Sequence, residues 1–475
     1  MSGAGDRKKK KDGVKKERFV LGGEGSGQDS SVLDRLLSDR TKSVMSSPHG
    51  MWNYMTYRDS IKILGIDPAE LYKDGRVDLD PAKWADFGWM TCFAGPPESA
   101  VAAMREHTDS RNINPYSPDL INPLREAAAE LKFKRPRDSH FEVIGVEGSQ
   151  AGISYVLQTV LNPGDEVIIT DPGYFHFESS ILMAGGVPVR VPLNEGNQFR
   201  YKPEELESYV TPRTKVIIVC DPLNPFGTVQ SKEELLQIIE IANSHGLVVI
   251  NDITHDTECI DPSVRHVPMT SLHGETDVDK VIATFSLSHG YGMAGVRIGF
   301  LGGAAGLMRA CLITKTSLTR LNTNLIAQYG ALAALGDEEY VRESEGIIRR
   351  NYAIIKDIVA NTEGLSIPVE PVYGFSMVLD VSGAGVTSQE LTVALFKYNV
   401  AVYPGDGLGS VGATRYVRLN ISRPDLWAFE RLRESLPLAI ADARSGLYKE
   451  SIVRFFEEKN TERAGTIART IKRGL

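Results

Sequence analysis

The stretch Ser286–Phe300, SLSHGYGMAGVRIGF, is the most specific segment of the chain. Its Ser286, Ser288 and Arg297 bring two hydroxyls and a guanidinium close together in the sequence. This set of donors suits a phosphate dianion, and the glycines between them let the backbone approach a ligand closely. A flexible glycine-rich loop without a ligand is the alternative interpretation. The segment therefore predicts a phosphate site.

Around this stretch, from about residue 112 to residue 325, apolar strand-like runs alternate with helical stretches. Near-continuous Val and Ile runs in such an alternation predict an α/β fold, with a mostly parallel sheet covered on both faces. Ligands of such sheets bind at the carboxyl ends of the strands. The expected organisation is a disordered basic tail over residues 1–30, an N-terminal arm with part of a small domain over 31–110, a large domain over 111–335, a small α+β domain over 336–445, and a helical extension over 446–475 that frays at the surface.

Two more segments follow strand-like runs of this region. Ser149 and Gln150 come after FEVIGV and before a helix, where backbone N–H groups at the helix start can approach a phosphate. Tyr174 comes after GDEVIITD, where an aromatic face can stack on a pyridine ring. Taken alone, an ordinary turn and a core tyrosine are the simpler interpretations.

Three polar side chains complete the pattern. Asn224 lies in the loop DPLNPFGT, and its amide can donate to a phenolate oxygen. Asp252 ends the run LVVIND, and a carboxylate buried there needs a cationic partner such as a protonated pyridine nitrogen. Arg418, in YVRLN, offers a guanidinium fork for a substrate carboxylate. A proline-rich loop, a helix-capping aspartate and a surface arginine are the alternatives.

Composition excludes several classes of protein. The 475 residues carry a net charge of −8, which argues against nucleic acid or an anionic membrane as the main partner. The sequence has no apolar run of about 18 residues, so no membrane-spanning helix is expected. Its four cysteines form no CxxC pair, so a cytoplasmic protein without disulfides is expected. The basic run Lys8–Lys11 has no apolar segment behind it and is not a secretory signal.

In order and spacing, these segments resemble the class I/II aminotransferases, which are fold-type I pyridoxal-phosphate enzymes of amino acid metabolism and biosynthesis. The resemblance covers roughly residues 90–440. It implies a sheet of the seven-stranded type, pyridoxal phosphate as cofactor, an amino acid or keto acid as substrate, and a homodimer. The implied roles are phosphate binding by Ser149, Gln150, Ser286, Ser288 and Arg297, ring stacking by Tyr174, contact with the ring oxygen and substrate by Asn224, pairing with the ring nitrogen by Asp252, binding of the substrate α-carboxylate by Arg418, and contact with the neighbouring subunit's phosphate by Tyr116.

The sequence departs from the family at the lysine that forms its Schiff base. That lysine stands eight residues before the phosphate-binding arginine, and counting back from Arg297 gives His289. The family's tyrosine three residues after the ring aspartate is His255 here, and Phe226 replaces the threonine of Asn-Pro-Thr-Gly. Because an imidazole cannot form a Schiff base, we expect the cofactor to be held non-covalently and ordinary transamination to be slow.

Three hypotheses follow. In the first, an enzyme uses His289 as acid/base in half-transamination, decarboxylation or elimination of an amino acid, while His255 replaces the tyrosine as a hydrogen-bond donor. In the second, the chain is a catalytically inactive ligand-binding or scaffold protein. In the third, His255 and His289 bind a metal together with His176 and Asp252.

Overall fold

The computed structural model describes residues 36–47, 53–67, 71–73, 76–320, 322–459 and 461–474. The tail expected over residues 1–30, with its Lys8–Lys11 run, lies outside them. Within the described residues, no helix is long and apolar enough to cross a membrane.

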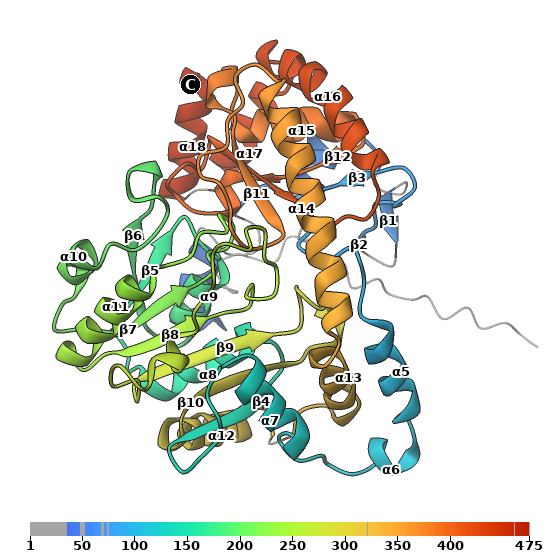
Figure 1. Ribbon diagram of the computed structural model, residues 1–475. Coiled ribbons are helices and arrows are strands. Elements are labelled where there is room, and N and C mark those ends of the chain that lie inside the picture. The colour runs from blue at the N-terminus through green and yellow to red at the C-terminus, as the bar shows by residue number, and fades with distance from the viewer. Residues whose placement is uncertain are drawn as a thin grey trace, which may run out of the picture.

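A seven-stranded sheet forms the centre of the larger part of the molecule (Figure 1). The strand order is β4-β10-β9-β8-β7-β5-β6. Only β10 runs antiparallel to its neighbours, and the other strand pairs are parallel, so the predicted mostly parallel sheet is confirmed. The strands are β4 (Phe141–Val146), β5 (Glu166–Asp171), β6 (Val187–Pro192), β7 (Thr214–Cys220), β8 (Val248–Asp252), β9 (Val281–Ser286) and β10 (Gly299–Ala304).

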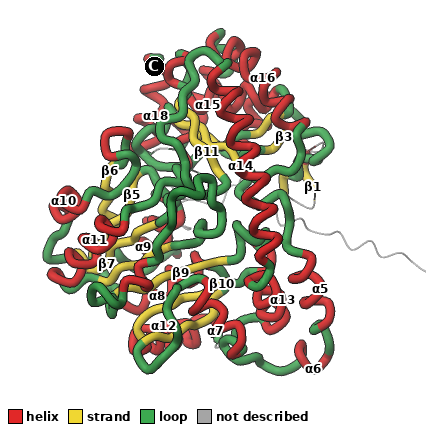
Figure 2. Tube along the Cα trace, viewed as in Figure 1, coloured by secondary structure: helices red, strands yellow, loops and turns green. Residues whose placement is uncertain are grey.

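Helices cover both faces of this sheet (Figure 2). Successive residues of a strand point to opposite faces. On β9, Phe285 packs into the core beneath α7 and α13, whereas Ile282 packs into the core beneath α8 and α12. Burial on both faces accounts for the continuous apolar runs in the sequence. The helices of this part are α5 (Glu98–Glu106), α6 (Ser110–Ile113), α7 (Asn122–Leu131), α8 (Ser149–Val160), α9 (His176–Met183), α10 (Pro203–Leu206), α11 (Lys232–His245), α12 (Ala305–Thr319) and α13 (Leu325–Leu335).

A smaller part lies at the far end of the long helix α14 (Figure 1). Its antiparallel sheet has the order β11-β14-β13, and β3 from the N-terminal arm pairs in parallel with β12. Residues of the N-terminal arm therefore form part of a core that is built mainly from the C-terminal third. The elements are α3 (Tyr57–Leu64), β1 (Tyr72–Lys73), β2 (Arg76–Val77), β3 (Ala85–Asp86), α14 (Glu338–Ala360), β11 (Ser376–Asp380), α15 (Ser388–Lys397), β12 (Val400–Ala401), β13 (Tyr403–Pro404), β14 (Tyr416–Asn420) and α16 (Trp427–Arg444). Helix α2 (Asp39–Ser46) of the arm packs instead on α9 of the larger part.

The C-terminal extension is packed, contrary to the expectation that residues 446–475 fray at the surface. It forms the paired helices α17 (Lys449–Glu458) and α18 (Glu462–Arg473). Ile452, Phe456 and Ile467 are buried in one apolar cluster with Met55 of the N-terminal arm. The apolar residues recur at helical spacing, so each helix has one face that must be covered.

We expect the substitution Phe456→Ala to lower the free energy of unfolding by about 3–5 kcal/mol, because it removes a fully buried ring from this cluster. Denaturation of the purified protein in urea measures the loss. The matched control is Arg454→Ala on the exposed side of α17, which should change stability by less than about 0.5 kcal/mol. Equal effects of the two substitutions would contradict the packing of α17.

Candidate active site

The side chains predicted to bind phosphate come together between β9, β10 and the start of α8. The hydroxyls of Ser286 and Ser288 lie 2.6 Å apart, and both side chains are buried. Arg297 donates from Nη2 to the backbone oxygen of Glu147 at 2.8 Å. A Cβ on Gly148 would lie 2.5 Å from that nitrogen, and Gly148 has a φ of +97°. This close approach therefore requires a glycine.

The first residues of α8 stand beside this guanidinium. The helix begins at Ser149, with Gln150 next, and no side chain caps its first N–H groups. Such uncapped N–H groups attract anions. Ser149 and Gln150 are partly exposed and Arg297 is exposed. Two hydroxyls, a guanidinium and a helix start fit the chemistry of a phosphate dianion.

Asp252 is buried at the end of β8. Its Oδ1 accepts hydrogen bonds from the backbone N of Thr254 at 3.1 Å and from the hydroxyl of Thr254 at 2.5 Å. Burial raises the pKa of Asp252, and the bonds from Thr254 oppose this rise. Asp252 forms no ion pair with Lys or Arg among the described residues. A cationic ring nitrogen would supply the missing partner.

Asn224 and Tyr174 follow the neighbouring strands β7 and β5, as predicted. Asn224 is buried, and Tyr174 is partly exposed within a cluster of aromatic rings that includes Phe177 at 5.3 Å. Burial and the nearby Asp252 carboxylate both raise the pKa of Tyr174.

His289 and His255 lie face to face. Their ring centres are 5.0 Å apart and the planes differ by 13°. The ring of Phe375, from the smaller part of the molecule, contacts both, at 5.3 Å from His289 and 5.6 Å from His255. His255 is buried, and its Nδ1 lies 2.5 Å from Oε2 of Glu258. We did not predict Glu258, although the His-x-x-Glu spacing was visible in the sequence.

The two imidazoles differ in their affinity for protons. Burial lowers the pKa of His289 well below its usual value, and the nearby cations His255 and Arg418 lower it further. Burial alone would also lower the pKa of His255, but the Glu258 carboxylate outweighs burial and raises it. At neutral pH, His289 is therefore uncharged and able to accept a proton, while His255 keeps its proton to higher pH than an ordinary imidazole.

Arg418, on β14, is a buried cation that forms no ion pair among the described residues. Its Nη2 donates to the backbone oxygen of Gly88 at 3.2 Å, and Nε has no hydrogen-bond partner among the described residues. The guanidinium stands 4.1 Å from the ring centre of Tyr403. Tyr54 and Tyr57 from the N-terminal arm are also close enough to affect its pKa. We did not predict these three tyrosines, because no local motif marks them.

Tyr116 lies apart from these residues. Its side chain is 73% exposed, and the guanidinium of Arg320 stands over its ring at 4.4 Å. The role implied for it concerns a neighbouring subunit, so that role and the homodimer remain predictions.

The metal hypothesis gains no support. Among the described residues, no three His, Cys, Asp or Glu side chains are placed to hold a metal ion. His176 instead packs against Phe175 with ring centres 4.1 Å apart, and burial lowers the pKa of His176 to about 4.

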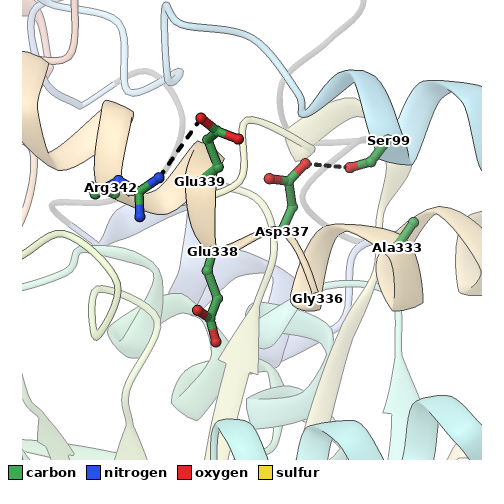
Figure 3. A pocket seen from close by; sticks show the side chains of 7 residues that line it. All are labelled: Ser99, Ala333, Gly336, Asp337, Glu338, Glu339 and Arg342. Carbon is green, nitrogen blue, oxygen red and sulfur yellow. Dashed lines mark hydrogen bonds and ion pairs between the residues drawn. The ribbon is translucent and has the colours of Figure 1, made fainter.

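A surface hollow lies where α13 meets α14 (Figure 3). None of the predicted site residues lines it. Its acidic side chains belong to the start of α14, where Asp337 caps the helix through the N–H of Tyr340 and accepts a hydrogen bond from Ser99 at 2.6 Å. We therefore attribute the acidic side chains of this hollow to the capping of α14 and not to a binding site.

A mostly parallel sheet with a buried aspartate at the end of β8 and donors that suit a phosphate beside it, together with a buried arginine on β14 of the second sheet, is the arrangement of an aminotransferase-like enzyme. The chain belongs to the class I and II aminotransferase family, whose sequence model it matches over residues 88–436. It is 32% identical to an aspartate aminotransferase of Pyrococcus abyssi over 329 residues, which cover 68% of this chain and 82% of that protein. It is 31% identical to aromatic-amino-acid aminotransferase 2 of Thermococcus litoralis, over 72% of this chain and 86% of that protein.

A solved structure confirms the fold. The aromatic aminotransferase from Pyrococcus horikoshii OT3 superposes with a TM-score of 0.69 at 25% identity, covering 80% of this chain and 99% of that one. The fold expected from the sequence is thereby confirmed.

We expect Gly148→Ala to weaken the binding of pyridoxal phosphate about tenfold or more, equivalent to at least about 1.4 kcal/mol. The added Cβ would displace the Arg297 guanidinium and strain a backbone that favours glycine. Absorbance titration with the cofactor measures the dissociation constant. Gly295→Ala, in the same loop as Arg297 but with open space around its Cβ, is the control and should bind normally. Normal binding by Gly148→Ala would contradict the position given to the cradle.

Proposed function

We propose that this chain binds pyridoxal phosphate non-covalently and acts on an amino acid, with His289 as the acid/base. The reaction is half-transamination, decarboxylation or elimination. The observation that carries the proposal is the placement of the His289 imidazole, which stacks on His255 with ring centres 5.0 Å apart and, by the resemblance, stands where the family has its lysine. Loss of the lysine removes the covalent link but leaves a group that can take up a proton.

The donors of the pocket fit this cofactor. Ser286, Ser288, Arg297 and the start of α8 would hold its phosphate, and Asp252 would pair with its ring nitrogen. Asn224 and His255 would face its ring oxygen, and Tyr174 would stack on the ring. When bound, pyridoxal phosphate supplies an electron sink for the negative charge left at the substrate α-carbon.

Non-covalent contacts must retain the cofactor, because no covalent link adds to them. The Arg297 guanidinium and the N–H groups at the start of α8 would therefore contribute a large part of the binding free energy through the phosphate. Charge-assisted hydrogen bonds to a phosphate are each worth about 1.5–3 kcal/mol. Several of them together are sufficient for reversible binding in the micromolar range.

Arg418 and His289 would divide the work on the substrate. The unpaired guanidinium of Arg418 binds the α-carboxylate and so fixes the α-carbon in the pocket. The uncharged imidazole of His289 then accepts the α-proton: the substrate C–H bond breaks, its electron pair stays on the substrate, and an N–H bond forms on the imidazole. The imidazolium can return that proton to another atom of the bound substrate.

We expect the cofactor to become covalently attached to the His289→Lys variant after borohydride treatment, because the new lysine amine can form a Schiff base that borohydride reduces. Wild type and His289→Ala should bind the cofactor without being fixed. Mass spectrometry of the intact protein after borohydride treatment and denaturation distinguishes these cases. Fixation in the wild type would show that another lysine reaches the cofactor, and the non-covalent proposal would fail.

The exchange of the substrate α-hydrogen tests the role of His289 as a base. With cofactor and each standard amino acid in D2O, NMR should detect exchange for at least one substrate, and His289→Ala should slow it by about 10²–10⁴-fold. Because the pKa of His289 is lowered, the rate should rise with pH through a pKa below 6.5 and be level at neutral pH. Cofactor binding without exchange and without release of CO2 from any amino acid would favour the inactive binding protein instead.

A further inference from the structure

Glu258 is a buried carboxylate that the proposed function does not use. Its side chain is 1% exposed, although a charged carboxylate in such a place is costly without a partner. Oε2 is 2.5 Å from Nδ1 of His255, and Oε1 has no hydrogen-bond partner among the described residues. The imidazole is thus the hydrogen-bond partner of this carboxylate.

The backbone around Glu258 is fixed from two sides. Its carbonyl oxygen accepts from the N–H of Gly374 at 2.8 Å, one residue before the Phe375 ring that contacts both imidazoles. On the other side, a Cβ on Gly290 would lie 2.0 Å from the hydroxyl of Thr257. The loop that carries His289 therefore rests directly on the loop that carries Glu258.

Among the charged groups that face His255, the Glu258 carboxylate raises its pKa most. The carboxylate of Asp252 adds to that effect, while the guanidinium of Arg418 opposes it. Burial also opposes it, and Glu258 makes the largest favourable contribution. The charged groups with the largest effects on the pKa of His289 are His255, Arg418 and Arg297, which are cations and lower it, whereas a backbone hydrogen bond with Met90 raises it.

The charges facing Glu258 come from the same loop and from α7. Asp256 repels a second negative charge, and Lys132, just after α7, attracts it. Nζ of Lys132 lies 3.3 Å from Oδ1 of Asp256, so the opposite charges of this ion pair largely cancel in their effect on Glu258. Burial raises the pKa of Glu258, and His255 is the cation that opposes this rise most.

We propose that Glu258 is a positioning residue: its carboxylate holds a proton on Nδ1 of His255, leaves Nε2 as the donor toward the cofactor, and through the stacked rings keeps His289 free of a proton. This inference rests on the proposed function for its catalytic meaning. Two stacked imidazoles repel each other when both are charged, so fixing the charge on His255 reserves His289 for proton uptake. Glu258 acts through His255 and touches neither cofactor nor substrate.

The substitution Glu258→Gln in cofactor-free protein tests the inference directly. By NMR of ¹⁵N-labelled histidines, the pKa of His255 should fall by about one unit or more, a tenfold loss of proton affinity, and that of His289 should rise. The control Asp261→Asn removes a carboxylate from the same loop, which accepts hydrogen bonds from the backbone N and hydroxyl of Ser263, and both histidines should titrate as in wild type. Unchanged titration of His255 in Glu258→Gln would overturn the inference.

The wild-type protein supplies a second measurement that does not depend on how the variant folds. ¹⁵N chemical shifts report which ring nitrogen carries a proton. At pH 7 we expect Nδ1 of His255 to be protonated and His289 to be neutral. A neutral His255 with its only proton on Nε2 would overturn the inference, whatever the behaviour of Glu258→Gln.

These measurements separate the inference from the proposed function, because they need neither cofactor nor turnover. A shift of His255 in a protein that never binds pyridoxal phosphate would keep the role of Glu258 and refute the function. If exchange is detected, the acid limb of its pH profile should move to higher pH in Glu258→Gln and stay in place in Asp261→Asn. A merely structural role of Glu258 would reduce the rate at every pH without moving that limb.

Discussion

The parallel register of β8 and β9 is the constraint on which the whole site depends. Asp252 pairs with Thr284 across these neighbouring strands, which lie about 4.8 Å apart in any sheet. The loops that follow β8 and β9 therefore begin side by side at the same edge of the sheet. His255 lies in the loop after β8, and His289 lies in the loop after β9. A slip of one residue would turn Asp252 to the opposite face and separate the imidazoles.

The pocket holds two buried charges of opposite sign that do not pair with each other. The Asp252 carboxylate and the Arg418 guanidinium come from different parts of the molecule; among the described residues, Asp252 forms no ion pair with Lys or Arg, and Arg418 forms none with Asp or Glu. Leaving both unpaired costs stability in the free protein. A ligand pair with one cationic ring and one carboxylate satisfies both, so binding should stabilise the fold beyond the direct contacts made.

The sequence revealed the features that are local in the chain. The Val and Ile runs predicted the sheet, and the residues directly after them, such as Asp252 and Asn224, predicted the pocket edge. It did not reveal Tyr54 beside Arg418, because that contact joins segments more than 350 residues apart. The buried faces of α17 and α18 were likewise missed, since an amphipathic pattern does not say which surface will cover it.

The cluster that joins Met55 to α17 and α18 has a consequence for how the chain is made. About 400 residues separate the two sides of this contact. Translation proceeds at roughly 5–20 residues per second, so α17 and α18 are synthesised on the order of 20–80 s after the N-terminal arm that they cover. During that interval its apolar side chains are exposed beside the ribosome. A chain truncated before α17 would stay in that state, where chaperones and proteases act on it.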